Sequence, residues 1–235
     1  MKNLLINMGK NSKNALVHKL SSKQKDKVLK DYYHLINKNR KSIINENKKD
    51  IKNANKKKIN NNLIQRLILN EEKISKIINS IKKIIKLKDP TNVILEKWKR
   101  PNGLNISKIS VPIGVIGVIY ESRPNVTSDV ASLCFKSGNT VILKGGSEAF
   151  NSNKILAKLF RQSLQKNKLD KNFVQFINIK NRKVVDFLLT RMNEFIDVII
   201  PRGGKNLVKK VQDLSTVPTI GHLEGICHSY VDKDA

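Results

Sequence analysis

Residues 111–125 read VPIGVIGVIYESRPN, and this stretch decides the fold. Its first part is a largely apolar run punctuated by Gly114 and Gly117, which is typical of a strand buried on both faces. The run ends in a polar turn that begins at Glu121 and contains an arginine and an asparagine. In open parallel sheets, ligands bind beyond the carboxyl ends of the strands. The sequence therefore predicts a binding site at this turn.

Two further strand–turn–helix junctions follow the same plan, VILKGGSE at residues 141–148 and VIIPRGGKNL at residues 198–207. In each, paired glycines let the backbone approach a ligand closely, and the helix that follows presents free amide groups to an anion. In the second junction these glycines are Gly203 and Gly204, and basic residues flank them. Phosphate is the ligand that such a turn favours.

The first of these junctions places Lys144 at the end of a buried strand, directly before Gly145, Gly146 and Ser147. The ammonium group of this lysine could donate to ribose hydroxyls or to a phosphate. The alternative, which also applies to the second junction, is an ordinary tight turn beside a solvated cation. Neither junction matches the Walker loop GxxxxGK[ST] or the dinucleotide fingerprint GxGxxG.

The turn after the first strand offers two candidate site residues. Asn125 could donate to an oxyanion that develops on a substrate, and Arg123 could bind an anionic substrate group. The alternative for each is helix capping or a solvated surface position. Pro124 fits the first turn of a helix, where its missing N–H costs nothing.

From residue 111 onward, predicted strands and helices alternate, which indicates an α/β fold with a parallel sheet covered on both faces. The predicted strands are residues 114–120, 140–143, 174–177, 197–200, 219–220 and 229–231. The predicted helices are residues 126–136, 151–165, 184–190 and 205–214.

The preceding part, up to about residue 88, has the periodicity of helices. Ser21 or Ser22 can cap one helix, whose apolar face could continue through residues 43–51. The Lys/Asn-rich residues 53–62 are predicted to be a loop, and isoleucines at helical spacing follow them. Between residues 98 and 113 the pattern changes to period two around a Pro-Asn-Gly turn, which predicts a β-ribbon.

The chain has 235 residues and a formal net charge of +27. Such a charge is typical of proteins that bind nucleic acids or anionic membranes. The alternative is compositional bias, because asparagine is as conspicuous as lysine here and adds no electrostatic affinity. Arginine, which makes bidentate contacts with bases and phosphates, supplies only eight of the 46 basic residues. We therefore predict no specific nucleic-acid partner, although polyanions should bind non-specifically at low salt.

The two cysteines, Cys134 and Cys227, lie in no CxxC pattern and near no histidine pair with zinc spacing. We predict no metal site and a reducing, cytoplasmic location. Cys134 lies on an apolar helix face and is predicted to be in the core. Cys227 should not form a nucleophile–base pair with His228, because adjacent residues of a strand point to opposite faces. No apolar run is long enough to cross a bilayer, so no membrane span is predicted.

Several short strings are distributed from about Lys13 to Ala235: KNALVHKL, ENKKDIKNA, LIQRLIL, ESRPNVT, VILKGGSEA, IIPRGGKNLV, STVPTI and GICHSYVD. In this order they resemble the gamma-glutamyl phosphate reductase family, also called glutamate-5-semialdehyde dehydrogenases, of the aldehyde dehydrogenase superfamily. ESRPNVT and IPRGG are the specific strings. The resemblance implies an aldehyde dehydrogenase-like, Rossmann-type parallel sheet with an N-terminal helical segment.

The resemblance also implies an activity, the NADPH-dependent reduction of gamma-glutamyl phosphate to the semialdehyde in proline biosynthesis, with release of phosphate. It assigns Lys144 to the adenosine ribose of the cofactor and the turn at Gly203 and Gly204 to the pyrophosphate. NAD-preferring members often have an acidic residue where this chain has Ser147, so the resemblance implies NADP. The acidic residue comes one position later, at Glu148.

The oxyanion asparagine of the superfamily does not align cleanly with this chain. Spacing from Gly114 points to Arg123, and spacing back from residues 138–139 points to Glu121. Asn125 is chosen on its chemistry alone.

The family's nucleophilic cysteine lies downstream of the strand that resembles GICHSYVD, in a segment that this chain does not contain. We expect a helical segment at residues 1–97, a subunit-pairing hairpin at 98–113, an NADP-binding domain at 114–220 and the start of a largely absent catalytic domain at 221–235. One hypothesis is an enzyme that pairs with itself or with a complementing C-terminal fragment. The other is a degraded or split NADP-binding half without turnover.

Overall fold

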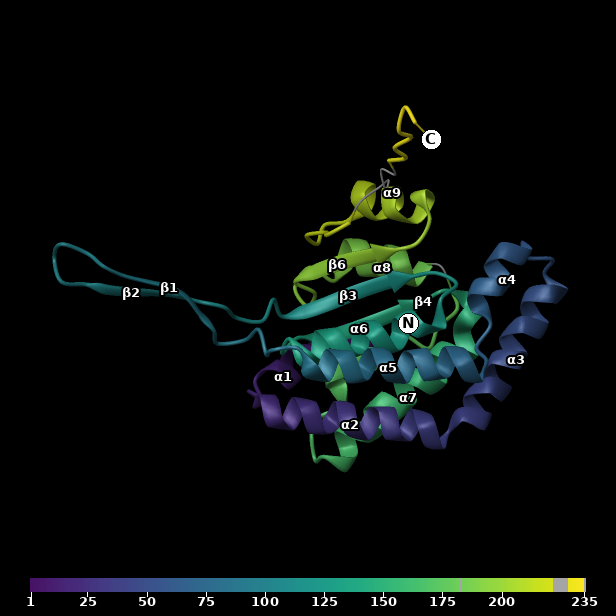
Figure 1. Ribbon diagram of the computed structural model, residues 1–235, viewed down its shortest axis with the longest axis horizontal. Coiled ribbons are helices and arrows are strands. Elements are labelled where there is room, and N and C mark those ends of the chain that lie inside the picture. Colours follow the sequence, from purple (N-terminus) through teal and green to yellow (C-terminus); the bar gives the residue numbers. More distant parts are fainter. Residues whose placement is uncertain (182, 222–227, 235) are drawn as a thin grey trace.

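The computed structural model describes residues 1–181, 183–221 and 228–234, and Figure 1 shows a layered body from which a long hairpin projects. A four-stranded, wholly parallel sheet forms the middle layer. Its strands lie in the order β5 (Val174–Phe176), β4 (Thr140–Gly145), β3 (Val115–Tyr120) and β6 (Val198–Arg202). The predicted α/β fold with a parallel sheet is confirmed.

Helices cover both faces of this sheet. On one face, α6 (Pro124–Lys136) and α7 (Phe150–Lys166) pack against the sheet, and α2 (Ser22–Lys38) and α5 (Glu71–Lys86) pack on these helices. The other face packs against α1 (Lys2–Leu16), α8 (Lys183–Arg191) and α9 (Lys205–Leu214). The remaining helical elements are α3 (Arg40–Lys56), α4 (Asn61–Leu67) and the short turns η1 (Ser147–Ala149) and η2 (Lys171–Phe173).

The side chains of β3 alternate between the two cores on either side of the sheet. Ile116 and Val118 belong to the core that contains α6 and α7, whereas Val115 and Ile119 belong to the core that contains α8 and α9. Every residue of the strand is buried. A strand buried on both faces needs apolar side chains at all positions, which explains the continuous run in the sequence.

The N-terminal helices agree with the sequence in part. Of the two predicted caps, Ser21 is the one that caps α2, and it does so in a reciprocal capping box with Gln24. The apolar face does not continue in one helix, because α2 ends at Lys38 and α3 starts at Arg40. The predicted loop at residues 53–62 is also too long, since α3 runs to Lys56 and α4 starts at Asn61.

The predicted β-ribbon is present and begins earlier than expected. Its strands are β1 (Ile94–Lys99) and β2 (Asn105–Ile109), paired antiparallel. The Pro-Asn-Gly turn joins them, with Gly103 at a φ of +87°. In Figure 1 this hairpin extends well beyond the sheet and helices.

One predicted strand is wrong, and another is reduced to a single bridge. Residues 229–231 form no strand, and Tyr230 and Val231 are 86% and 77% exposed. Residues 219–220 contribute only one bridge, between Thr219 and Ile199. A strand is stabilised by hydrogen bonds to a neighbour, and local β-propensity does not supply that neighbour.

The start of β3 depends on a glycine. Gly114 has a φ of +129°, and a Cβ there would overlap the Asp197 carboxylate. That carboxylate accepts the Val115 N–H at 2.7 Å and pairs with Lys13 at 2.8 Å. We expect Gly114→Ala to lower the free energy of unfolding by about 2–4 kcal/mol, because strain and overlap add. Urea denaturation measures this loss.

The matched control is Gly103→Ala in the hairpin turn. This residue also has a positive φ, but a Cβ there would meet nothing within 4 Å. Its cost should therefore be the backbone strain alone, about 1 kcal/mol. Equal losses in the two variants would contradict the role given to Asp197.

Candidate functional site

The carboxyl ends of three adjacent strands lie side by side at one edge of the sheet. Tyr120, at the end of β3, is in register with Gly145 of β4 on one side and with Arg202 of β6 on the other. The Glu121 N–H donates to the Arg202 carbonyl at 3.1 Å, just beyond this register. The structure thus brings the three predicted junctions to one edge.

Lys144 is held at this edge in a nearly buried position. The residue is 7% exposed, and its Nζ donates to the Gly145 carbonyl at 2.8 Å. Burial lowers the pKa of its ammonium group, and the nearby Glu148 carboxylate partly offsets that shift. An ammonium group with little water around it has donors available for a ligand that enters beside it.

Glu148 ties the turn after β4 to the turn after β3. Its Oε1 accepts from the Ser122 N–H at 2.8 Å and from the Ser122 hydroxyl at 2.9 Å. Ser122 has a φ of +43°, an uncommon conformation for a residue with a side chain. Ser147, which precedes Glu148 in the turn after β4, is exposed and carries no charge. The negative charge of Glu148 is therefore engaged by the protein itself.

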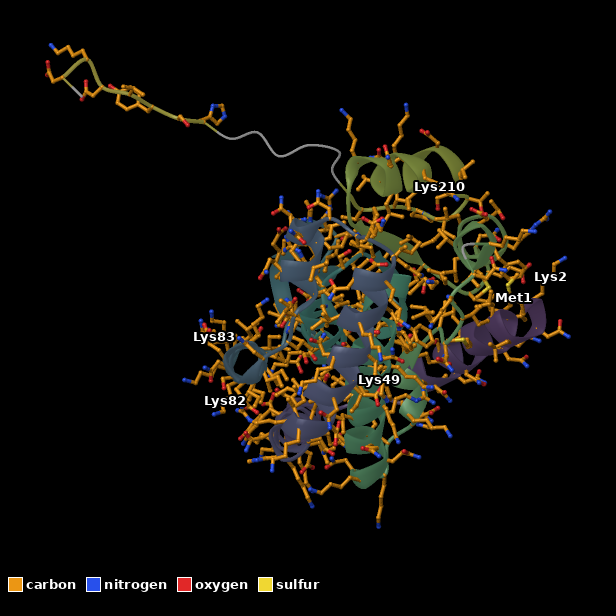
Figure 2. All side chains as sticks on the ribbon, turned by 90° about the vertical axis from the view of Figure 1, so that its right-hand side faces the viewer. Met1, Lys2, Lys49, Lys82, Lys83 and Lys210 are labelled. Atoms are coloured by element: carbon orange, nitrogen blue, oxygen red, sulfur yellow. The ribbon has the colours of Figure 1, made fainter. Side chains whose placement is uncertain are left out.

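A hollow of about 310 Å³, which we call the Lys144 hollow, opens over these turns. Gly145, Gly146 and Ser147 form part of its wall, and Asn206 of α9 also lines it. Two more cations, Lys180 and Lys210, also line it. Lys210, labelled in Figure 2 beside α9, pairs with Asp186 at 2.6 Å. The hollow has the glycine turn and the donors that a nucleotide requires.

Gly203 and Gly204 do not line the Lys144 hollow but adjoin it through Glu121. The Gly204 N–H donates to Glu121 Oε2 at 2.9 Å, so this carboxylate caps the start of α9. A Cβ at Gly203 would come within 2.5 Å of the same oxygen, which explains the glycine. Glu121 also lines the Lys144 hollow, so the two glycine turns adjoin each other through this residue.

Arg123 and Asn125 lie at the start of α6, at the same edge. Arg123 is the N-cap residue and Pro124 occupies the first turn, as predicted. The Asn125 side chain is exposed, and its Nδ2 donates to Asp129 at 3.1 Å. Both residues line a hollow of about 360 Å³ against α5. The oxyanion role of Asn125 stays a prediction.

The sequence predicted no role for Arg66, and it indicated Arg202 only as one of the basic residues that flank the glycine turn. In the structure, both line a hollow of about 250 Å³ with Arg123, Gly203 and Gly204. Arg66 belongs to the string LIQRLIL, which contributes to the family resemblance and to no predicted site. Arg66 lies far along the chain from Arg123 and Arg202, so no sequence pattern indicates that the three residues lie close together.

Cys134 is in the core, as predicted, and its burial raises the pKa of its thiol to about 12. The reactive form of cysteine is the thiolate. In a Cys227→Ala variant, Cys134 should therefore resist iodoacetamide at neutral pH and react only after unfolding in urea. Mass spectrometry of the labelled chain checks this, and rapid labelling of the folded chain would contradict it. Cys227 lies outside the described residues.

The described residues also bear on metals, membranes and charge. They contain no group of three or more His, Cys, Asp or Glu side chains that could hold a metal ion. None of the helices in the described part is both long and apolar enough to cross a membrane. In Figure 2, the labelled lysines belong to α1, α3, α5 and α9, so the positive charge is spread over several elements.

Comparison with known proteins places these features in a family context. No protein-family model matches the chain. The gamma-glutamyl phosphate reductase of Ruthia magnifica subsp. Calyptogena magnifica is 43% identical over 237 residues, which cover 100% of this chain and 56% of that protein. The gamma-glutamyl phosphate reductase of a Nitratiruptor species is 50% identical over 173 residues, 74% of this chain and 42% of that protein.

Solved structures give the same result. The crystal structure of gamma-glutamyl phosphate reductase from Thermotoga maritima has a TM-score of 0.88 at 36% identity, covering 92% of this chain and 52% of that one. A probable aldehyde dehydrogenase from Listeria monocytogenes EGD-e shares the fold alone, with a TM-score of 0.68 at 15% identity, covering 94% of this chain and 46% of that one.

The parallel sheet, its two helical layers and these likenesses define an aldehyde dehydrogenase-like fold. Within this class, the chain is homologous to the N-terminal half of gamma-glutamyl phosphate reductases. It spans about half the length of the curated relatives that it matches.

Proposed function

We propose that this chain provides the cofactor-binding part of an NADPH-dependent reductase that converts L-glutamyl 5-phosphate to L-glutamate 5-semialdehyde and phosphate in proline biosynthesis. The observation that carries this proposal is the Lys144 hollow, which lies beyond the ends of parallel strands in a chain homologous to gamma-glutamyl phosphate reductases. When bound, the nicotinamide supplies the hydride. The chain's own residues bind and orient the cofactor and hold the anionic substrate.

The cofactor would lie along the edge of the sheet. The Lys144 ammonium group would donate to the adenosine ribose, and the turn at Gly145, Gly146 and Ser147 lets the ligand approach the backbone. The diphosphate would lie toward Gly203 and Gly204, beyond Glu121. The adjacency of the two glycine turns through this glutamate supports that path.

The charges of the Lys144 hollow favour NADPH over NADH. Lys144, Lys180 and Lys210 line it together with Glu121 and Glu148, so the cations outnumber the carboxylates by one, and a 2′-phosphate is attracted by an excess of cations. The Glu148 carboxylate accepts two hydrogen bonds from Ser122 through Oε1, which engages part of its negative charge. Equal affinities for NADPH and NADH would contradict this preference.

The reacting end of the substrate would meet the turn after β3. Arg123 would bind an anionic substrate group, and Asn125 would donate to the oxyanion. Cys134 is buried at the opposite end of α6 from this turn and cannot serve as a nucleophile there. We place the nucleophilic cysteine in the part of the reductase length that this chain does not match. That part would be a complementing C-terminal fragment or a continuation of the chain.

The hairpin offers a surface for pairing with a second copy. Leu95, Trp98 and Ile109 are exposed on it, at 56%, 42% and 50%. Exposed apolar side chains on a projecting ribbon are typical of a subunit interface. We therefore propose that the chain forms a homo-oligomer through this hairpin. We also propose a cytoplasmic location and no specific nucleic-acid partner, as the sequence predicts.

A fusion protein tests the reductase proposal. This chain is joined to the unmatched C-terminal part of the Ruthia magnifica relative and supplied with glutamate-5-semialdehyde, phosphate and NADP. The expected result is NADPH formation that requires all three and is much slower with NAD. NADPH binding without turnover would favour the second hypothesis, a binding half that has lost catalysis.

A further inference from the structure

Three arginines from distant parts of the chain converge on one hollow. Arg66 lies in the last turn of α4, Arg123 precedes α6, and Arg202 ends β6. The hollow that they line has a volume of about 250 Å³ and includes Gly203 and Gly204. We call it the arginine hollow. Only eight arginines occur among the 46 basic residues, so three in one hollow are not a consequence of the lysine-rich composition.

The three guanidinium groups have no protein acceptor within the described part of the chain. Two other arginines do have one, since Arg40 donates to Glu71 Oε2 at 2.9 Å and Arg161 donates to the Val174 carbonyl at 2.8 Å. A guanidinium group presents a planar set of donors that matches the oxygens of a phosphate or a carboxylate. The three arginines are exposed, and three such sets of donors around one hollow point to an anionic ligand.

The backbone that carries these arginines is held in place. The buried Asn47 side chain donates to the Leu67 carbonyl at 2.9 Å and accepts from the Leu69 N–H at 2.7 Å, directly beside Arg66. Arg202 is the last residue in the β3–β6 register. Ligand binding would therefore cost little of the entropy needed to bring the three residues together.

The charge of the arginine hollow identifies the kind of anion. Glu121 lines the hollow as well, and its carboxylate already occupies the start of α9 by accepting the Gly204 N–H. Three guanidinium groups and one carboxylate leave a net charge of +2. A phosphoryl group carries about −1.5 to −2 at neutral pH, so its charge is complementary.

We propose that the arginine hollow binds the phosphoryl group of the acyl phosphate substrate. This inference rests on the proposed function for the identity of the ligand. The same phosphate chemistry could come from the diphosphate of the cofactor, because Gly203 and Gly204, toward which we place the diphosphate, also line the arginine hollow. The two sources predict different results when phosphate and NADPH are titrated separately.

Isothermal titration of the 235-residue chain with inorganic phosphate tests the proposal, at constant ionic strength because the net charge is +27. We expect one saturable site, weakened about tenfold or more in Arg66→Gln and in Arg202→Gln, because each loses charged hydrogen bonds. The phosphate affinity of Arg66→Lys should lie between those of the glutamine variants and the parent, because lysine keeps the positive charge but lacks the paired donors of a guanidinium group. Arg100→Gln, in the exposed hairpin turn, is the matched control and should change nothing.

Glu121→Gln provides a variant with the opposite sign. The amide oxygen can still accept the Gly204 N–H, while one negative charge leaves the arginine hollow. Phosphate should bind several-fold more tightly, a result that impaired folding cannot produce. Weaker or unchanged phosphate binding in this variant would count against the proposal.

The NADPH arm separates the two sources of phosphate. The proposal requires that Arg66→Gln leave NADPH affinity within about twofold of the parent, because the diphosphate would lie toward the glycine turn and not on the Arg66 side chain. Equal loss of NADPH and phosphate affinity in Arg66→Gln would assign the hollow to the cofactor and overturn the proposal. Equal weakening by Arg100→Gln would also overturn it. Phosphate binding without NADPH binding would instead contradict the proposed function and leave the arginine hollow standing.

Discussion

Lys144→Met should weaken NADPH binding by about tenfold to a hundredfold, as expected for the loss of charged hydrogen bonds in a partly desolvated site. Methionine keeps most of the side-chain volume and removes the ammonium group. The measurement is a titration of NADPH fluorescence with the chain. Lys154→Met is the matched control, because Lys154 is exposed on α7. Equal NADPH affinity in the parent and Lys144→Met would contradict the role given to Lys144.

The parent chain and Lys144→Met also allow a test of the pH dependence of NADPH binding. Burial lowers the pKa of Lys144 from the ordinary value of 10.5. The ammonium form is the one that attracts NADPH, so affinity should fall as the pH rises through this lowered pKa. The fall should occur at a lower pH than an exposed lysine would give. It should be absent in Lys144→Met, which has no proton to lose there.

Asp50→Ala should lower the free energy of unfolding by about 3–5 kcal/mol, the cost expected for breaking a buried, charged hydrogen-bond network. Asp50 projects from α3 and is 1% exposed. Its Oδ1 accepts from the N–H and Nδ2 of Asn151, at 3.0 and 2.8 Å. Its Oδ2 accepts from the N–H and hydroxyl of Ser152, at 2.8 and 2.7 Å. The variant leaves these donors at the start of α7 unsatisfied.

Urea denaturation measures this loss, with Asp213→Ala as the control. Asp213 is an exposed carboxylate on α9, so its removal should cost less than about 0.5 kcal/mol. Asp50→Asn keeps one acceptor oxygen, so its loss of unfolding free energy should lie between those of Asp50→Ala and Asp213→Ala. A loss below about 1 kcal/mol in Asp50→Ala would contradict the view that this carboxylate anchors α7 to α3.

The sequence predicted the parts of the fold that follow from local patterns. The apolar run of β3 indicated a strand buried on both faces, and β3 is buried throughout. Three junctions of one design predicted a shared edge, because parallel strands bring their carboxyl ends together. The predicted strand at residues 229–231 failed because β-propensity is local, whereas a strand needs a partner.

The candidate site was predictable only where one junction supplies it. Lys144 and the two glycine turns are visible in the sequence, since each belongs to a single strand–turn–helix unit. The meeting of Arg66 with Arg202 is not visible, because it depends on how α4 packs beside the sheet edge. The hydrogen bonds that Glu121 and Glu148 make also depend on the conformation of the turn between β3 and α6.

A crystal structure of the chain with NADP bound tests the central claim most directly. We predict that the adenosine ribose lies against Lys144 in the Lys144 hollow and that the diphosphate lies toward Gly203 and Gly204. A dinucleotide bound elsewhere, for example on the lysines of α5, would show that the shared edge of the parallel strands is not the cofactor site.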